Sequence, residues 1–215
     1  MAWRPVLVLL AAVATPAWGG AAARNPLPDD FAAAVAVAVK DARTDPDGWA
    51  ARARGWRGLF VGDRVVRPGL PTLQTVEGVP AVDEAIAFLD RQPPVAGLIR
   101  SPMLDHAARD HADDQSRTGA TGHQGADGSR PATRMARYAR WRGVAETIAY
   151  GGDTPEAMVL QLIIDDGVPG RGHRAILFDP DYSHLGVACA DHPIYRTVCV
   201  LDFGRRYDRA VSPGP

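Results

Sequence analysis

Apolar residues recur at intervals of three and four over residues 82–91 and fall on one face of 101–117, which is the spacing of one helix face. These patterns predict helices over 82–91 and 101–117. An Ala/Val-rich stretch predicts a helix over 31–40, and we expect a second helix over 48–57. Gly and Pro residues interrupt the pattern at 44–48 and again through 60–76. We therefore expect a break between the first two helices and an irregular excursion before the third.

The predicted helix over 101–117 carries two histidines on different faces. Ser101 precedes a proline, as expected of an N-cap residue whose side chain bonds to the first turn. His111 falls on the same face as the apolar stripe, whereas His106 falls outside it. A lone histidine in an apolar stripe is more often a core residue than a ligand. We therefore expect His111 to be buried and structural, and His106 to be solvated.

The stretch from 154 to 178 starts as a helix and then changes character. Thr154 is followed by Pro and Glu, which is a favourable helix opening, and an apolar stripe comes next. The stripe runs into Asp165 and Asp166, and the glycines after them end the helix before His173. Because a buried carboxylate is costly without a partner, two acids at the inner end of a buried helix indicate a site.

Two further polar residues stand out in the middle of the chain. His123 lies at the centre of a Gly-rich loop over 118–129, and a basic helix is expected over 134–142. Glu146 is a lone acid in the apolar segment 144–151, and by itself it reads as a surface residue or a helix-end partner. No GK[ST] sequence follows the loop, and no G-x-S-x-G elbow is present. These absences argue against a P-loop protein and a serine hydrolase.

The N-terminus has the pattern of a secretory signal peptide over residues 1–20. Arg4 precedes a short apolar run, and residues 17–19 form a plausible small-x-small cleavage site. The run is far shorter than the ~20 residues that span a bilayer. A buried N-terminal helix is the alternative. We therefore expect a secreted or periplasmic protein with no transmembrane segment in its mature form.

The composition is that of one globular domain. The chain has 215 residues, of which 46% are hydrophobic and 23% charged, enough for a single domain with a proper core. We place this domain at residues 24–208 and a disordered tail at 209–215. The 24 Lys and Arg residues against 25 Asp and Glu give a formal net charge of −1. This balance offers no electrostatic case for a nucleic-acid partner.

Export to an oxidising compartment bears on the expected state of the two cysteines, Cys189 and Cys199. In an oxidising compartment an even number of cysteines more often forms a disulfide than free thiols. Apolar residues alternate before and after a turn at 191–193, which predicts an antiparallel hairpin with one cysteine on each strand. A bridge between Cys189 and Cys199 is therefore expected. Metal binding by the two thiolates is the weaker alternative, since no CxxC spacing is present.

Several of these features, taken together, resemble one family. They are His123 in its Gly-rich loop, Glu146 before Ile148, the helix that ends at Asp165, the step Gly172-His173-Arg174 and the closing strand 199–203. Their order and spacing resemble the CAP superfamily of cysteine-rich secretory, antigen 5 and pathogenesis-related proteins, and its bacterial secreted members most. The likeness covers about residues 31–203. Two departures are Ala145-Glu146-Thr147, where the family usually has Gly-Glu-Asn, and Asp165, where it commonly has Glu.

The resemblance implies an α+β fold, an α-β-α sandwich with a central twisted antiparallel sheet. It also implies a cleft in which His123 and His173 are the paired imidazoles and Glu146 and Asp165 the paired carboxylates. Asp166 is the reserve candidate for the last acid, because helical phase places it along the stripe of Val159 and Ile163. Cys189 and Cys199 keep their predicted structural role.

Three functions are compatible with such a quartet of side chains. In the first, a CAP-type binding protein holds a divalent ion such as Zn2+ through His123 and His173, and a flanking groove takes an extracellular lipid, peptide or cell-envelope ligand. In the second, the same cleft is a metal-assisted hydrolase that uses Glu146 or Asp165 as general base. In the third, the quartet is a buried hydrogen-bond network that pins loops to the core. We favour the first, because no dedicated nucleophile or third strong zinc ligand is visible.

Overall fold

The structure of the protein is a computed structural model that describes residues 27–205. The predicted signal peptide over 1–20 and the predicted tail over 209–215 lie outside these residues. Among the helices of residues 27–205, none is both long enough and apolar enough to cross a membrane.

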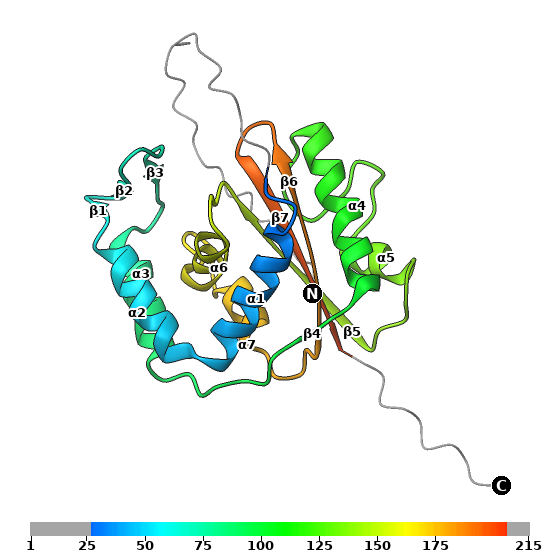
Figure 1. Cartoon of the computed structure of the whole chain (residues 1–215), viewed down its shortest axis with the longest axis horizontal. Coiled ribbons are helices and arrows are strands. Elements are labelled where there is room, and N and C mark those ends of the chain that lie inside the picture. The colour runs from blue at the N-terminus through cyan, green and yellow to red at the C-terminus, as the bar shows by residue number, and fades with distance from the viewer. Residues whose placement is uncertain (1–26, 206–215) are drawn as a thin grey trace, which may run out of the picture.

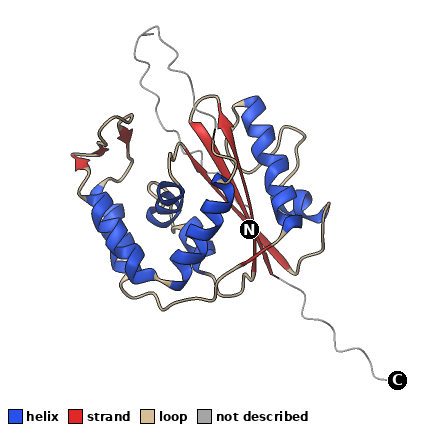
Figure 2. Ribbon diagram, viewed as in Figure 1, coloured by secondary structure: helices blue, strands red, loops and turns tan. Residues whose placement is uncertain are grey.

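A four-stranded sheet forms the middle layer of the molecule, and helices cover both of its faces (Figures 1 and 2). The strands lie in the order β4-β6-β7-β5. Their bounds are Ile99–Arg100 for β4, Gly143–Tyr150 for β5, His184–His192 for β6 and Arg196–Arg205 for β7. The expected α-β-α sandwich is confirmed. The sheet is not wholly antiparallel, however, because the short edge strand β4 pairs with β6 in parallel.

The two faces of the sheet carry different helices. One face is covered by α4 (Pro102–Thr118) and α5 (Pro131–Ala136), and the other by α1 (Phe31–Thr44), α6 (Pro155–Ile164) and α7 (Gly172–Phe178). A hairpin of α2 (Pro46–Arg57) and α3 (Val79–Leu89) packs beyond the second set of helices (Figure 1). Between α2 and α3, the expected irregular excursion contains a small sheet of β1 (Phe60–Val61), β2 (Arg64–Val65) and β3 (Leu73–Gln74).

The prediction of a basic helix over 134–142 is wrong for most of its length. Helix α5 ends at Ala136, and the chain then crosses to the start of β5. This crossing brings the Trp141 ring onto the backbone of Gly204, where a Cβ atom would lie 2.5 Å from the ring. The arginines of 134–142 carry no apolar stripe that could extend the helix, so the packing of the aromatic side chain decides the local path.

The two predicted helix caps differ in outcome. The Thr154 hydroxyl accepts a hydrogen bond from the backbone N–H of Ala157 at 3.1 Å, as expected of an N-cap. Ser101 occupies the N-cap position of α4, but its side chain makes no capping bond. Its carbonyl accepts from the Asp105 N–H at 2.9 Å instead. The prediction of a side-chain cap at Ser101 is therefore wrong.

Small residues bring α4 very close to the sheet. Ala107, Ala108 and Ala112 are buried on the face that contacts β6 and β7. A Cβ atom added to Gly186 on β6 would lie 2.1 Å from the backbone carbonyl carbon of Leu104. Only glycine fits at this crossing, and the close approach places the polar side chains of α4 against those of the sheet.

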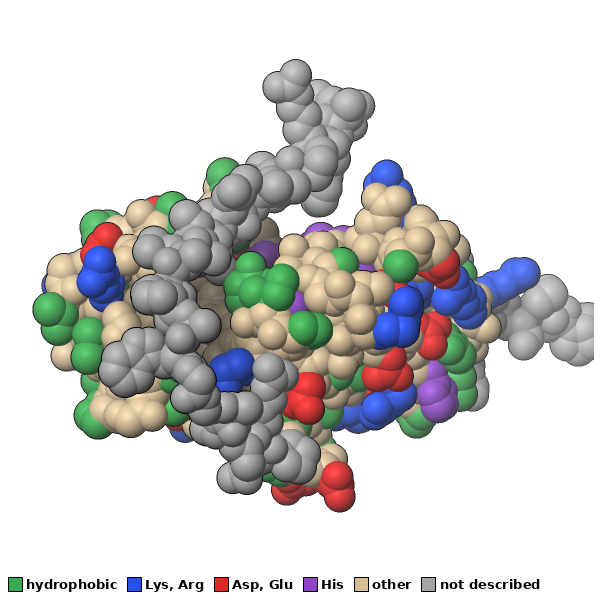
Figure 3. Space-filling model, turned by 90° about the horizontal axis from the view of Figure 1, so that it is seen from above, with side chains coloured by type: hydrophobic (Ala, Val, Ile, Leu, Met, Phe, Trp, Pro, Cys, Tyr) green, Lys and Arg blue, Asp and Glu red, His purple; other side chains and the backbone are tan. Residues whose placement is uncertain are grey.

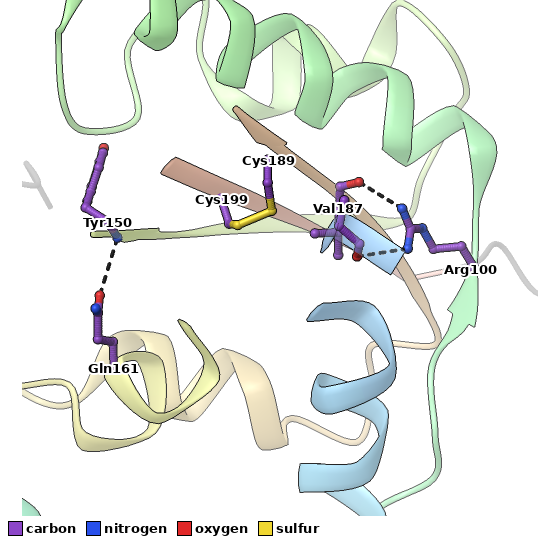
Figure 4. Close-up of a disulfide and its surroundings, with 7 residues drawn as sticks. Arg100, Tyr150, Gln161, Val187, Cys189 and Cys199 are labelled. Atoms are coloured by element: carbon purple, nitrogen blue, oxygen red, sulfur yellow. Dashed lines mark hydrogen bonds between the residues drawn. A yellow bond between two sulfur atoms is a disulfide. The ribbon is translucent and has the colours of Figure 1, made fainter. Parts of the chain in front are cut away.

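The predicted hairpin and disulfide are both confirmed. Strands β6 and β7 pair antiparallel with Cys189 directly opposite Cys199, and the two sulfur atoms are bonded (Figure 4). The cysteines share the sheet face that packs against α1 and α6. Near them, Gln161 of α6 accepts from the backbone N–H of Tyr150 at 3.3 Å, which ties α6 to the end of β5 (Figure 4).

Candidate functional site

The four predicted site residues come together beside β5, the edge strand at the opposite side of the sheet from β4. Glu146 lies on β5, and His123 lies on the loop between α4 and α5. Asp165 and His173 come from the end of α6 and the start of α7, on the opposite helical layer. The centroids of the His123 and His173 rings are 6.3 Å apart. The site is thus assembled from both helical layers where they meet at the edge of the sheet.

Glu146 is buried, and both of its carboxylate oxygens accept hydrogen bonds. Its side chain is 0% exposed, and Oε1 accepts from His123 Nδ1 at 2.8 Å while Oε2 accepts from Arg134 Nη2 at 2.7 Å. Burial would raise the pKa of Glu146, but the hydrogen bond from His123 and the charge of Arg134 outweigh it and hold the pKa below its ordinary value. The simple interpretation of Glu146 as a surface residue or helix-end partner is therefore wrong.

On the opposite helical layer, Asp165 holds His173. It follows the last residue of α6 and adopts a left-handed conformation with a φ of 56°. Oδ1 accepts from His173 Nδ1 at 2.6 Å, and Oδ2 accepts from the His173 backbone N–H at 2.8 Å. The Asp165 side chain is 1% exposed. The sharp turn at this residue lets one carboxylate grip both the backbone and the ring of His173.

Asp166 belongs to a different contact. Its carboxylate accepts from the backbone N–H groups of Val76 and Glu77 at 2.6 and 2.8 Å. The helical phase that made Asp166 the reserve candidate ends at Ile164, because Asp165 is no longer helical. Asp165, and not Asp166, is therefore the acid beside His173.

The two imidazoles are held in the same way. In each ring Nδ1 is bonded to a buried carboxylate, so Nδ1 is the nitrogen that donates, and in the neutral form of the ring Nε2 has the lone pair. The His123 side chain is 48% exposed and the His173 side chain 24% exposed. Two accessible imidazoles, one exposed and one half-buried, each oriented by a carboxylate, are the arrangement that metal-binding histidines commonly show.

A hydrogen-bond network fixes the loop that carries His123. Gln115 Nε2 donates to the Gly122 carbonyl at 2.6 Å, and the Gly122 N–H donates to the Tyr150 hydroxyl at 2.9 Å. Burial raises the pKa of Tyr150 to about 12, so this hydroxyl keeps its proton and donates to Gln115 Oε1 at 2.9 Å. Gly122, the residue before His123, is thus anchored to both α4 and β5.

The remaining histidines of this region have supporting roles. His111 is buried, and its Nε2 lies 2.8 Å from the Gly122 carbonyl oxygen. Burial lowers the pKa of His111, so the ring is neutral. This confirms its predicted position in the core. His106 is exposed and stacks on Tyr138, as expected of a residue outside the site. His192 Nε2 donates to the Ala120 carbonyl at 3.0 Å and adds a further anchor to the His123 loop.

Two residues beside Glu146 were not predicted from the sequence. Arg134 is 2% exposed and donates to Glu146, to the His123 carbonyl at 3.1 Å and to Ser129. Asp202 on β7 is 0% exposed and lies opposite Glu146 in the strand register. A signal for Asp202 does exist, since it is the single polar residue in the otherwise apolar run 198–203, and such a run is typical of a strand buried on both faces. Arg134 has no such signal.

A hollow of about 570 Å³ lies beside the His173 end of the site. Its walls are Val76, Glu77, Glu84 and the loop 167–171. Arg171 bridges Glu77 and Glu84 across it. Seen from above, histidine side chains come to the surface near the middle of the molecule, and charges of both signs are interspersed on the same face (Figure 3). The hollow thus combines an apolar wall with a paired charged rim.

The groups at this site that could serve as metal ligands are the two imidazoles. Within residues 27–205, no three His, Cys, Asp or Glu side chains are grouped so that they could hold an ion together. Glu146 and Asp165 are bonded to the imidazoles rather than directed at the opening. An ion at Nε2 of both rings would therefore complete its shell with water or with a ligand, as in an open site.

Comparison with known proteins places these features in context. No curated protein matches the chain. Among solved structures, the chain is similar to an outer surface protein of Borrelia burgdorferi, with 19% identity over 53% of this chain and 80% of that one and a TM-score of 0.46. It is also similar to an extracellular protein containing an SCP domain from Bacillus anthracis, with 18% identity over 57% of this chain and 37% of that one and a TM-score of 0.45.

A third similar structure is a cysteine-rich secretory protein of Staphylococcus aureus, with 13% identity over 64% of this chain and 42% of that one and a TM-score of 0.40. The chain thus spans less than half of the Bacillus and Staphylococcus proteins. The family model for CAP, the cysteine-rich secretory protein family, matches residues 92–203, from the segment before β4 to the end of the apolar run in β7. The chain belongs to the cysteine-rich secretory protein (CAP) family.

Proposed function

We propose that this protein is an exported CAP-domain binding protein, secreted or periplasmic. In this proposal His123 and His173 bind a divalent cation such as Zn2+, and the neighbouring hollow takes an extracellular lipid, peptide or cell-envelope ligand. The observation that carries the proposal is the matched pair of carboxylate–imidazole bonds, which orients two Nε2 atoms at an accessible edge of the sheet. The signal-peptide pattern at 1–20 supports export.

The positions of the acids favour binding over hydrolysis. A general base must reach the proton that it removes. The Glu146 and Asp165 side chains are 0% and 1% exposed, and each already accepts hydrogen bonds at both of its carboxylate oxygens. Neither is free to activate a water molecule at the opening. The acids instead set the orientation of the imidazoles, which is a binding role.

The experiment that tests the proposal is a calorimetric Zn2+ titration of the purified, metal-stripped chain. We expect one weak site in the wild type, no binding in the His123→Ala/His173→Ala double variant, and unchanged binding in His106→Ala, which removes an exposed histidine outside the site. Absence of binding to the wild type, or binding retained by the double variant, would rule out the metal site. A large fall in melting temperature in the double variant without any zinc effect would support the purely structural role instead.

A further inference from the structure

Asp202 and Glu146 face each other across two neighbouring strands. They are register partners in the antiparallel pair β5–β7, so their side chains leave the same face of the sheet. Such partners have Cβ atoms about 4.5–5.5 Å apart. Both side chains are buried beneath α4 and α5, on the side of the sheet that holds Arg134. The two carboxyl groups therefore share one water-excluded space.

Asp202 has no donor among the residues that the structure describes. Neither of its oxygens receives a hydrogen bond from an N–H group within residues 27–205. The neighbouring cation is Arg134, whose two Nη atoms donate to Glu146, His123 and Ser129. Its Nε is itself without a partner. His111 Nδ1 is also buried without a partner. A charged carboxylate in this position would be costly, since nothing compensates for its lost hydration.

The group that Asp202 faces across the strand pair is the Glu146 carboxyl. Two carboxylates are both acceptors, so they can bond to each other only when one of them carries a proton. Glu146 is the charged member, because it accepts from Arg134 and from His123. We propose that Asp202 is a neutral carboxylic acid that donates its proton to Glu146 and, acting through Glu146, is a positioning residue for the His123 ring.

The electrostatics of the buried layer agree with this assignment. Burial and then the charge of Glu146 raise the pKa of Asp202 well above its ordinary value, and the charge of Arg134 only partly opposes them. Asp110 of α4, which accepts from Tyr138 at 3.0 Å, adds to the negative field on this side. With a neutral Asp202 and a neutral His111, the buried charges of Arg134 and Glu146 cancel. With a charged Asp202 they would not.

A protonated Asp202 gives Glu146 a third hydrogen-bond donor beside His123 and Arg134. The carboxylate is then held from three directions, and the His123 ring is fixed with its proton on Nδ1. An amide at position 202 can donate in the same way as the acid, whereas an apolar side chain of similar size cannot. Asp202→Asn and Asp202→Leu therefore separate the hydrogen bond from the packing.

The experiment uses the metal-free chain at pH 7, so its outcome does not depend on whether the protein binds zinc. Infrared spectroscopy is expected to show the carbonyl stretch of a protonated carboxylic acid in the wild type. This band should be lost in Asp202→Asn and kept in the control Asp166→Asn, whose carboxylate accepts two backbone N–H bonds. Absence of the band in the wild type, or its survival in Asp202→Asn, would overturn the proposal.

Nitrogen NMR of the imidazoles gives the second readout. We expect a single Nδ1–H tautomer for His123 in the wild type and in Asp202→Asn, and loss of that single tautomer in Asp202→Leu. A purely structural role for Asp202 would not move this signal while the fold is intact. If Asp202→Leu keeps the wild-type tautomer, Asp202 does not position His123. If Asp202→Leu fails to fold, the infrared comparison with Asp202→Asn still decides the protonation state.

Discussion

Asp165 grips His173 at two points, with one carboxylate oxygen on the backbone N–H at 2.8 Å and the other on ring Nδ1 at 2.6 Å. The grip depends on the left-handed conformation of Asp165, which ends α6 and turns the side chain back toward α7. One residue therefore does two things. It closes a helix, and it sets the direction of an imidazole.

Substitution of Asp165 separates these two roles. Asp165→Asn tolerates the left-handed conformation and keeps one acceptor oxygen, so we expect a loss of about 1 kcal/mol in the free energy of unfolding. Asp165→Ala loses the hydrogen bonds that the carboxylate accepts from His173 and Arg174, and adds the cost of a left-handed alanine, so we expect about 3 kcal/mol. Urea denaturation measures both. Equal losses in the two variants would contradict this account of the turn.

The buried charge of Glu146 should contribute more to the free energy of unfolding than the charge of an exposed acid such as Glu84. Glu146→Gln leaves Arg134 buried without its ion-pair partner, for which we expect a loss of about 3 kcal/mol in the free energy of unfolding. Glu84→Gln removes an acid whose side chain is 49% exposed, and should cost less than about 1 kcal/mol. Urea denaturation of the two variants side by side is the measurement. A small effect at Glu146 would mean that Arg134 finds another partner.

Much of the fold was predictable because its determinants are local. The stripe of α6 and the alternation around Cys189 and Cys199 each depend on neighbours in the chain, and both are confirmed. The path of 137–142 was not predictable, because the contact of Trp141 with Gly204 on a distant strand decides it.

The residues of the candidate site were likewise predictable only in part. The choice between Asp165 and Asp166 depends on a single backbone turn, which the helical period alone does not describe. The role of Arg134 depends on α5 packing over β5, a contact between segments whose patterns carry no sign of it. The resemblance to a family brought His123, Glu146 and His173 together, and the residues beneath them required the three-dimensional arrangement.

The raised pKa of Asp202 predicts a specific pH dependence. Its folded pKa lies above the ordinary value of 3.8, so between these two values the native state binds a proton that the unfolded state has lost. Stability from this group is therefore largest below about pH 4 and falls as the pH rises toward the folded pKa. Asp202→Asn removes the titration. The variant should gain stability relative to the wild type as the pH rises.

Urea denaturation at a series of pH values from about 4 to about 8 checks this prediction. The difference between Asp202→Asn and the wild type should grow in favour of the variant along the series. A difference that stays constant with pH would show that Asp202 has an unshifted pKa.

Reduction of the Cys189–Cys199 bridge should weaken the fold without abolishing it. The bridge joins residues 10 apart in the chain, and closing a short loop of this kind contributes about 2 to 3 kcal/mol. Strands β6 and β7 remain paired along their length without it. We expect a lower urea midpoint in the presence of reductant. The Cys189→Ser/Cys199→Ser variant should match the reduced wild type and should not respond to reductant.

Because the site lies at an edge strand, its two imidazoles belong to the two different helical layers. His123 moves with α4 and its following loop, and His173 moves with α6 and α7, so the 6.3 Å between their rings reports how the two outer layers sit against the sheet. A ligand bridging both rings would act as a clamp across the open side of the sandwich. Loosening of either layer would release it, and its binding would hold both layers in place.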